Sequence, residues 1–239
     1  MTEHFEFQSI GRVHSPYKEK FAIPRQPGLV SAAKGHIELL GDCNREEILR
    51  GIEGFSHVWL SFVFHQAIKE DWKPMVRPPR LGGNKKVGVF ASRSPFRPNP
   101  IGLSVVKLEG VKQRSHNGQA NQWQLHFSGG DLLDGTPILD IKPYIPYADA
   151  LPEACGGFAE TAPDQSTHVE FSPELAATLQ AAELKHAGFA ELIQQVLSQQ
   201  PEPAYHKASE RDYGVQLYDY NVRWRRIDSH LMVFEISPI

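Results

Sequence analysis

The chain has 239 residues, of which 41% are hydrophobic and 22% charged, and a formal net charge of −3. This composition is typical of a folded globular protein and excludes a disordered tail protein. The length allows one large domain or two modest ones. Only two cysteines are present, Cys43 and Cys155, which excludes a disulfide framework and favours a reducing compartment.

The N-terminal residues 1–10 lack the basic and apolar regions of a signal peptide. The longest apolar run, Val58–Phe64, is far shorter than the ~20 residues of a membrane span. We therefore expect a cytoplasmic protein with no membrane segment.

The first two-thirds of the chain predicts β-structure. Short segments rich in β-branched and aromatic residues lie between Gly, Pro, Asn and Asp, which is the pattern of strands. The expected strands cover residues 7–15, 35–40, 56–64, 87–92, 102–108, 122–127 and 137–142. A short helix is expected over Asn44–Gly51. Many strands with few helices between them predict a closed barrel or a sandwich, not a parallel sheet.

A change of composition after Tyr147 predicts a second domain. Residues 151–165 are rich in Ala, Pro and Gly, as in a linker, and a helix is expected from Ser172, with a break near Gly188. Residues 215–225 and 231–236 then predict a hairpin. We expect a mainly β domain over residues 1–150 and a smaller α+β domain over residues 155–239.

The charge pattern predicts an anionic partner. Trp72–Leu108 contains eight Lys and Arg residues and no Asp or Glu, although the whole chain is slightly acidic. Nucleic acid is the first candidate, and the alternative is a loop with solvated charges. On a C-terminal strand, Arg223 and Arg225 face away from Tyr220 and Trp224. The expected RNA-binding residues are Arg77, Arg80, Lys85, Lys86, Arg97, Arg223 and Arg225.

Several common enzyme signatures are missing. The sequence has neither a dinucleotide-binding GxGxxG nor a P-loop, and it has no GxSxG nucleophile elbow. Its 11 histidines form no HxH or HExxH spacing, so we expect no metal site. Three loops remain as site candidates, namely residues 21–28, 64–66 and 134–137, and ordinary turn chemistry is the alternative for each.

Three segments resemble the TsaA-like (VirR-related) family: SRSPFRPNPIGLS at 92–104, RPPRLGG at 77–83 and LLDGTPILDIKPYIPYAD at 132–149. Residues 21–28, 55–66 and 219–225 match as well, so the resemblance covers nearly the full chain. Bacterial two-domain members are tRNA methyltransferases. They use S-adenosylmethionine to methylate N6 of threonylcarbamoyladenosine at tRNA position 37, in the anticodon loop. The resemblance implies a small closed β-barrel instead of a Rossmann sheet, and a homodimer with the cofactor near the subunit boundary.

The same resemblance implies which residues bind the cofactor. They are Pro24, Arg25, Gln26, His65, Gln66, Arg93, Leu103, Asp134, Gly135, Thr136 and Pro137. A sulfonium methyl is already electrophilic, so the enzyme has to align it with N6 and exclude water. An acceptor for the N6 proton would help, and the sequence leaves Asn99 and Asp134 open as catalytic candidates.

Three other functions stay open on the sequence. The first is a non-catalytic module that binds RNA or S-adenosylmethionine and acts in regulation. The second is a methyltransferase with another acceptor, such as a protein or a small molecule. A barrel hydrolase is the third, and the lack of a nucleophile–base pair disfavours it.

Overall fold

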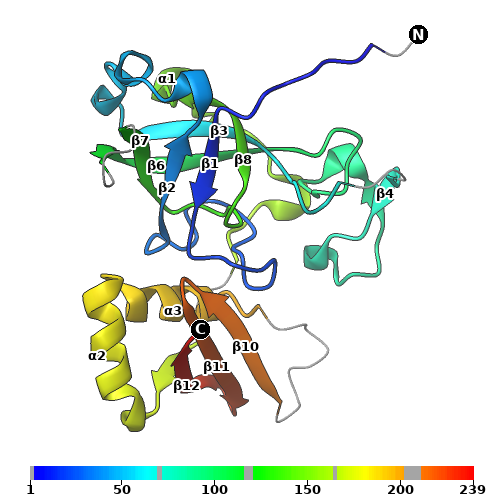
Figure 1. The fold of residues 1–239 in the computed structure, drawn as a ribbon. Coiled ribbons are helices and arrows are strands. Elements are labelled where there is room, and N and C mark those ends of the chain that lie inside the picture. Colours follow the sequence, from blue (N-terminus) through cyan, green and yellow to red (C-terminus); the bar gives the residue numbers. More distant parts are fainter. Residues whose placement is uncertain (1–2, 69–71, 116–120, 164–165, 202–210) are drawn as a thin grey trace. The chain divides into compact units, whose positions relative to one another are not determined.

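The computed structural model describes residues 3–68, 72–115, 121–163, 166–201 and 211–239 (Figure 1). The last two residues of the expected linker therefore lie outside the described residues. Contacts divide the chain into two compact units, each built from three segments. Unit 1 contains Met1–Arg12, Ile37–Leu125 and Thr136–Ala162. Unit 2 contains Val13–His36, His126–Gly135 and Pro163–Ile239.

Among the described residues, six strands form one hydrogen-bonded sheet in the order β1-β2-β7-β6-β3-β8, and β1 also pairs with β8. The strands are β1 (Gly11–His14), β2 (Lys34–Leu39), β3 (His57–Val63), β6 (Ile101–Arg114), β7 (Gln122–Ser128) and β8 (Pro137–Pro143). The prediction of a mainly β first part is confirmed. Because the last strand of the order returns to the first, the arrangement is the one that a closed barrel requires.

Alternating side chains explain how β3 takes its place in this sheet. Val58, Leu60 and Phe62 are buried, and the residues between them are partly exposed. In the pair of β3 with β6, Phe62 lies opposite Gly102. A Cβ atom on Gly102 would lie 2.3 Å from the Phe62 ring, so only glycine allows the two strands to approach here.

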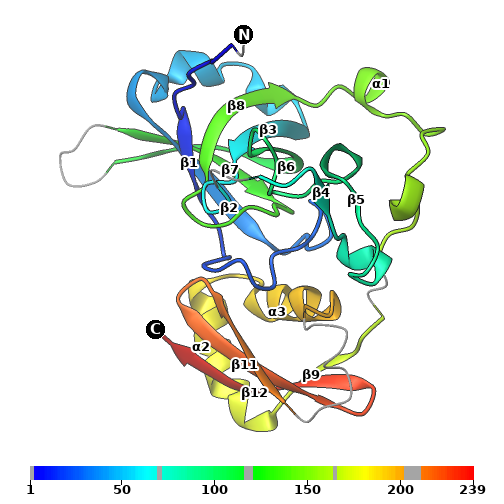
Figure 2. The same cartoon turned by 90° about the vertical axis from the view of Figure 1, so that its right-hand side faces the viewer.

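Unit 2 contains a four-stranded sheet in the order β10-β11-β12-β9 (Figure 2). Its strands are β9 (Val169–Phe171), β10 (Asp212–Leu217), β11 (Tyr220–Ile227) and β12 (His230–Pro238). The helices α2 (Ala176–Lys185) and α3 (Phe189–Ser198) are separated at Gly188, whose φ of 89° ends the path of an ordinary helix. The predicted α+β character and the predicted helix break are therefore confirmed.

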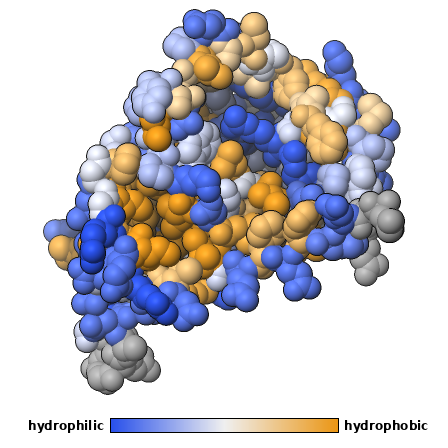
Figure 3. Space-filling view, turned by 90° about the horizontal axis from the view of Figure 1, so that it is seen from above, coloured by the Kyte–Doolittle hydropathy of each residue, from blue (hydrophilic) through white to orange (hydrophobic). Residues whose placement is uncertain are grey.

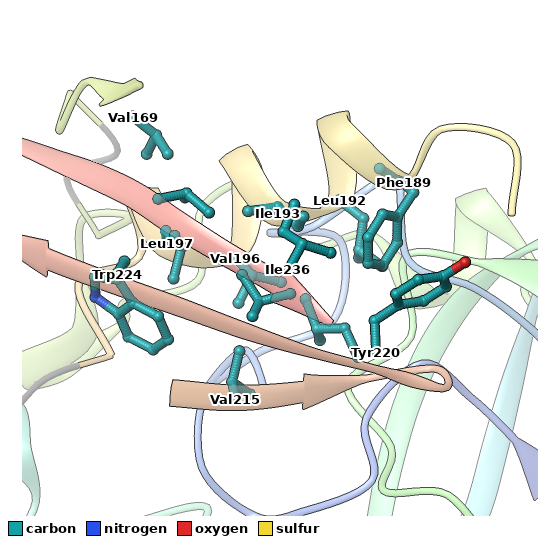
Figure 4. Packing of buried hydrophobic residues seen from close by; sticks show 14 of the residues in the cluster. Val169, Phe189, Leu192, Ile193, Val196, Leu197, Val215, Tyr220, Trp224 and Ile236 are labelled. Carbon is teal, nitrogen blue, oxygen red and sulfur yellow. The ribbon is translucent and has the colours of Figure 1, made fainter. Parts of the chain in front are cut away.

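The hydrophobic core of unit 2 lies between α3 and the sheet (Figure 4). Apolar residues of α3, including Leu192, Ile193 and Val196, are fully buried, and so is Trp224 of β11. Residues from the N-terminal part of the chain complete this core. Tyr17 bridges to Leu217, and the Phe21 ring stacks on Trp224 with a centroid distance of 6.1 Å.

The remaining regular elements are short. They are β4 (Met75–Val76), β5 (Val87–Gly88), α1 (Pro146–Asp149) and 3-10 turns at Gly41–Cys43, Glu46–Leu49, Ile52–Gly54, Pro79–Leu81, Val89–Ala91, Gly157–Ala159 and Pro173–Leu175. No helix in the described part of the chain is both long enough and apolar enough to span a membrane.

Three local predictions were wrong. The expected helix over Asn44–Gly51 is a single 3-10 turn at Glu46–Leu49, and the Asn44 side chain bonds to the backbone of residues 121 and 123 instead of capping a helix. The expected strand over residues 87–92 is only β5 followed by a 3-10 turn. Residues 215–225 are two strands, because Tyr218 takes a φ of 54° and starts a turn between β10 and β11.

Candidate active site and nucleic-acid interface

In unit 1, the end of β3 and the starts of β6 and β8 lie at one edge of the sheet. Val63 pairs with Ile101, and Phe62 pairs with both Gly102 and Ile138. The candidate residues in this region lie at or next to the ends of these three strands. They are His65, Gln66, Asn99, Thr136 and Pro137. Residues far apart in the sequence are therefore brought to one edge by antiparallel pairing.

The loop before β6 is held by its own side chains. The Ser92 hydroxyl donates to the Val89 carbonyl at 2.8 Å and accepts from the Ser94 amide at 3.3 Å. Arg97 donates to the carbonyl oxygens of Ser92 and Ser94 at 3.2 and 3.5 Å. Arg97 was predicted to bind RNA, and in the structure its guanidinium shapes this loop.

Backbone hydrogen bonds join this loop to the end of β3. The Phe64 amide donates to the Pro100 carbonyl at 2.8 Å, and the Ile101 amide donates to the Asn99 carbonyl at 2.7 Å. His65 and Asn99 each lie one residue from the first of these bonds. Asn99 is exposed, so its amide side chain is accessible for a ligand.

In unit 2, the carboxylate of Asp134 is held by two partners. One oxygen accepts from the Ser15 amide at 2.9 Å, and the other lies 2.8 Å from the Lys18 ammonium. The backbone of the turn is also fixed, because the amides of Asp134 and Gly135 donate to the carbonyls of Tyr17 and Val13. A carboxylate has about four lone-pair positions, so Asp134 keeps acceptor capacity for a ligand.

The loop over residues 21–28 is attached to the core of unit 2. Phe21 stacks on Trp224, Pro24 is buried, and the Gly28 amide donates to the Gly129 carbonyl at 2.8 Å. Arg25 is exposed and Gln26 is half-buried. The predicted cofactor loop is thus positioned by an aromatic residue of the C-terminal sheet, which the sequence did not indicate.

Two more of the predicted cofactor residues in unit 1 are exposed. Leu103 is 56% exposed and pairs with Ser61, whereas Arg93 belongs to the loop before β6. Thr136, at the start of β8, is only 3% exposed, so its side chain is inside the fold. Figure 3 shows that apolar residues gather in one area of the face seen from above, with hydrophilic residues around it.

The basic segment 72–108 lies in unit 1 and holds most of its charges outside the core. Lys73, Arg77, Lys85 and Lys86 are exposed, and none of them has a carboxylate partner among the residues that the structure describes. Arg80 differs, because its guanidinium donates to the Thr161 carbonyl. This segment therefore presents uncompensated positive charge.

The arginines of β11 are placed as predicted but are neutralised. Arg223 and Arg225 face away from the buried Trp224. Arg223 contacts Glu235 at 2.8 Å, and Arg225 contacts both oxygens of Asp212 at 3.1 and 3.2 Å. No sequence pattern indicated these carboxylates or Phe234, whose ring lies against both guanidiniums.

The turn between β10 and β11 is tied to α2 by charge. Asp219 contacts His186 at 2.5 Å and also accepts from Lys185. Partial burial raises the pKa of Asp219, but the hydrogen bonds from Lys185 and His186 lower it more, so the net pKa lies below its ordinary value.

The described residues contain no group of three or more His, Cys, Asp or Glu side chains that could hold a metal ion. The candidate residues of each unit offer guanidinium and amide groups, and unit 2 adds the Asp134 carboxylate; such groups suit the amino-acid and adenosine parts of an organic cofactor.

Comparison with known proteins identifies the family. Residues 12–150 match the tRNA-methyltransferase O N-terminal domain, and residues 164–239 match the TrmO C-terminal domain. The chain is 48% identical over 236 residues to the tRNA (adenine(37)-N6)-methyltransferase of Escherichia coli, covering 98% of each chain. It is 51% identical over 219 residues to a candidate S-adenosylmethionine-dependent methyltransferase of Pseudomonas aeruginosa, covering 90% of each. A crystal structure of TrmO from Pseudomonas aeruginosa is similar with a TM-score of 0.79 at 40% identity, covering 100% of this chain and 99% of the other. The chain therefore belongs to the tRNA-methyltransferase O family.

Proposed function

We propose that this protein is an S-adenosylmethionine-dependent enzyme that methylates N6 of the adenine at position 37 of tRNA, with N6-threonylcarbamoyladenosine as the substrate nucleoside. The observation that carries the proposal is the 48% identity to the Escherichia coli tRNA (adenine(37)-N6)-methyltransferase over 98% of both chains. A likeness of this extent includes both family domains and all the predicted site segments.

The ring of strands β1-β2-β7-β6-β3-β8 is, in this proposal, a small barrel that carries the cofactor site. The exposed guanidiniums of Arg25 and Arg93 suit the carboxylate of the cofactor. The cofactor shell is completed by the other predicted residues, Pro24, Gln26, His65, Gln66, Leu103, Asp134, Gly135, Thr136 and Pro137.

When bound, S-adenosylmethionine supplies an electrophilic methyl group on a positive sulfur. The chain has to align N6 of the nucleoside with that methyl and to accept the N6 proton. Asp134 is the stronger base of the two candidates, and its contacts with Ser15 and Lys18 hold it in a fixed orientation. Asn99 is too weak a base to take the proton, but its amide oxygen can accept a hydrogen bond and orient N6.

The exposed charges of Arg77, Lys85 and Lys86 attract the tRNA backbone in this proposal, and the C-terminal domain holds the anticodon loop. The domain limits expected from the sequence, residues 1–150 and 155–239, separate these two roles along the chain. The loop over residues 21–28 belongs to unit 2 together with the C-terminal sheet, and its Phe21 stacks on Trp224.

We also propose a homodimer in the cytoplasm, where tRNA is the abundant substrate. The exposed apolar side chains of Ile101 and Leu103, 43% and 56% exposed, lie on the outer face of β6 and fit a second copy. Sedimentation at several protein concentrations tests the dimer, with Leu103→Asp as the variant that should shift it to monomer.

Transfer of a labelled methyl group to tRNA tests the activity. We expect incorporation into tRNA that carries threonylcarbamoyladenosine, and none into tRNA without this group. Binding of S-adenosylmethionine, measured by calorimetry in the presence of a chelator, should be unchanged. Binding of both ligands without any turnover would instead support a regulatory module.

A further inference from the structure

Strand β12 of the C-terminal sheet contains a β-bulge opposite Arg223 and Trp224. Arg223 pairs with Glu235, whereas the next residue, Trp224, pairs with Val233, so Phe234 is an extra residue in β12. A bulge of this kind turns two consecutive side chains to the same face of a sheet. Val233 and Ile236 are buried, and Phe234 and Glu235 between them are partly exposed.

Phe234 supports two guanidiniums from β11. The guanidinium carbon atoms of Arg225 and Arg223 lie 4.5 and 5.3 Å from the centre of its ring. Carboxylates hold the same groups, since Arg223 contacts Glu235 at 2.8 Å and Arg225 contacts Asp212 through two nitrogen atoms. Both side chains are nevertheless 45–46% exposed. Each guanidinium is therefore held in orientation on a side chain that stays nearly half exposed.

A shallow concavity of about 330 Å³ lies beside Arg223. Its lining is mostly polar: Glu19, Gly214, Val215, Gln216, Asn221, Arg223, Glu235 and Ser237. Gly214 contributes no side chain to this lining, and a Cβ atom there would lie 3.6 Å from Cγ of Arg223, in van der Waals contact. The concavity thus combines a guanidinium with amide, hydroxyl and carboxylate groups.

The balance of charge decides what this surface can bind. Two guanidiniums, Arg223 and Arg225, face three carboxylates, Asp212, Glu235 and Glu19. Much of the hydrogen-bonding capacity of the guanidiniums is used by these carboxylates, so a phosphate gains little here. A neutral, flat group has no such disadvantage, because a guanidinium plane stacks on an aromatic base and polar neighbours bond to the edge of the base.

We propose that Arg223, supported by Phe234, and the concavity beside it form a subsite for one unpaired nucleobase of the RNA. The base stacks on the Arg223 guanidinium, and its edge meets Asn221, Gln216 or Glu19. This inference rests on the proposed RNA substrate, and it replaces phosphate binding by Arg223 and Arg225 with base recognition. Stacking of one base contributes about a tenfold gain in affinity or more.

Binding of anticodon stem-loop RNAs, each with one abasic nucleotide in the loop, tests the subsite. With the wild-type protein we expect one abasic position to weaken binding about tenfold. Gly214→Val places a branched side chain in the concavity against Arg223, and we expect this variant to bind the intact RNA about tenfold more weakly and to be insensitive to that abasic position. Phe234→Leu removes the aromatic ring beneath the Arg223 guanidinium, and we expect it to weaken RNA binding as well. Gly54→Val is the matched control, because a side chain at Gly54 meets open space.

Salt dependence separates the base from a phosphate. A lost base contact leaves the slope of log affinity against log salt unchanged, whereas a lost phosphate contact reduces it by about 0.7–0.9. Wild-type affinity in both variants, with all abasic effects retained, would overturn the subsite, and so would a reduced slope. A wild-type protein that neither binds nor methylates tRNA would overturn the proposed function and the subsite together. Thermal unfolding of each variant confirms that the fold is intact, and Phe234→Leu carries the test if Gly214→Val is unstable.

Discussion

Two arginine-bearing regions of this protein look alike in the sequence and differ in the structure. In the basic segment, Arg77, Lys85 and Lys86 are exposed and have no carboxylate partner among the described residues. In the C-terminal sheet, Arg223 and Arg225 are paired with Glu235 and Asp212. The first region can therefore attract phosphates over a distance, whereas the second is suited to short-range contacts.

The two regions also differ in what supports them. Before β6 begins at Ile101, the regular elements of the basic segment are two-residue strands and 3-10 turns, and Phe90 within it is 79% exposed. The arginines of β11 flank Trp224, which is fully buried in the core of unit 2. Local changes in the first region should therefore alter binding, and changes beneath the second should alter folding.

The largest effect is expected for Trp224→Ala. Removal of this fully buried indole should lower the free energy of unfolding by about 3–5 kcal/mol. Chemical denaturation measures this change, and Phe90→Ala, at an exposed ring in the basic segment, should cost less than about 0.5 kcal/mol. If both variants lost the same free energy of unfolding, the proposed difference between the two regions would be wrong. Because Phe21 stacks on Trp224, Trp224→Ala should also weaken S-adenosylmethionine binding if the loop over residues 21–28 belongs to the cofactor site.

The packing of residues 13–36 bears on domain truncation. A chain that ends near Tyr147 loses the partners of Tyr17 and Phe21, including Leu217 and Trp224. We expect such a fragment to be unstable in denaturation experiments. The roles of the two domains are therefore better separated with point variants of the full chain.

The next effect concerns the basic segment. Replacement of Arg77, Lys85 and Lys86 together by Gln should weaken tRNA binding about 10²-fold at 0.1 M salt, because about three phosphate contacts and their released counterions are lost. The salt slope should fall by about 2–3. Lys142→Gln is the control, because this lysine is already paired with Asp140. If the slope of log affinity against log salt is unchanged in the triple variant, the RNA does not bind at the basic segment.

A smaller effect is expected when one negative charge is removed from the outer face of the C-terminal sheet. Asp212→Asn removes the carboxylate that both Arg223 and Arg225 contact. The released guanidinium should then bind phosphate, so RNA affinity should rise a few-fold at low salt and the slope should steepen by about 0.7–0.9. Filter binding over a salt series measures both. If affinity falls instead, the contact with Asp212 is itself needed to hold Arg223 for stacking on the base.

The smallest effect concerns the helices behind this sheet. The carboxylate of Glu183 accepts from the amides of Gly188 and Ala190 at 2.8 Å, and these hydrogen bonds hold its pKa below the ordinary value. A lowered pKa stabilises the fold at pH values above the unfolded pKa, and this stabilisation is lost as the pH falls through the folded pKa. The free energy of unfolding at pH 7 should be about 1 kcal/mol higher for the wild type than for Glu183→Gln. The difference should shrink at pH below about 4, as measured by denaturation at several pH values, and a constant difference would exclude this charge effect.

Local patterns in the sequence predicted much of the fold. The strand expected over residues 56–64 is β3, at His57–Val63, and Gly188 marked the break between two helices. The turn at Tyr218 was missed because a tyrosine with positive φ carries no glycine or asparagine signal. The helix over Asn44–Gly51 was wrong because Asn44 bonds to a strand more than 70 residues away.

By itself, the sequence determined the family, the mainly β character of the first part and the break between the two helices, because these depend on motifs and on short-range patterns. Only the tertiary structure decided which charges are neutralised, which aromatic ring supports Arg223, and that residues 13–36 pack with the C-terminal core. These features arise from strand pairing, from the bulge at Phe234 and from contacts between residues up to about 200 positions apart, such as Tyr17 with Leu217. No local pattern encodes such contacts, because the partners come together only when the chain has folded.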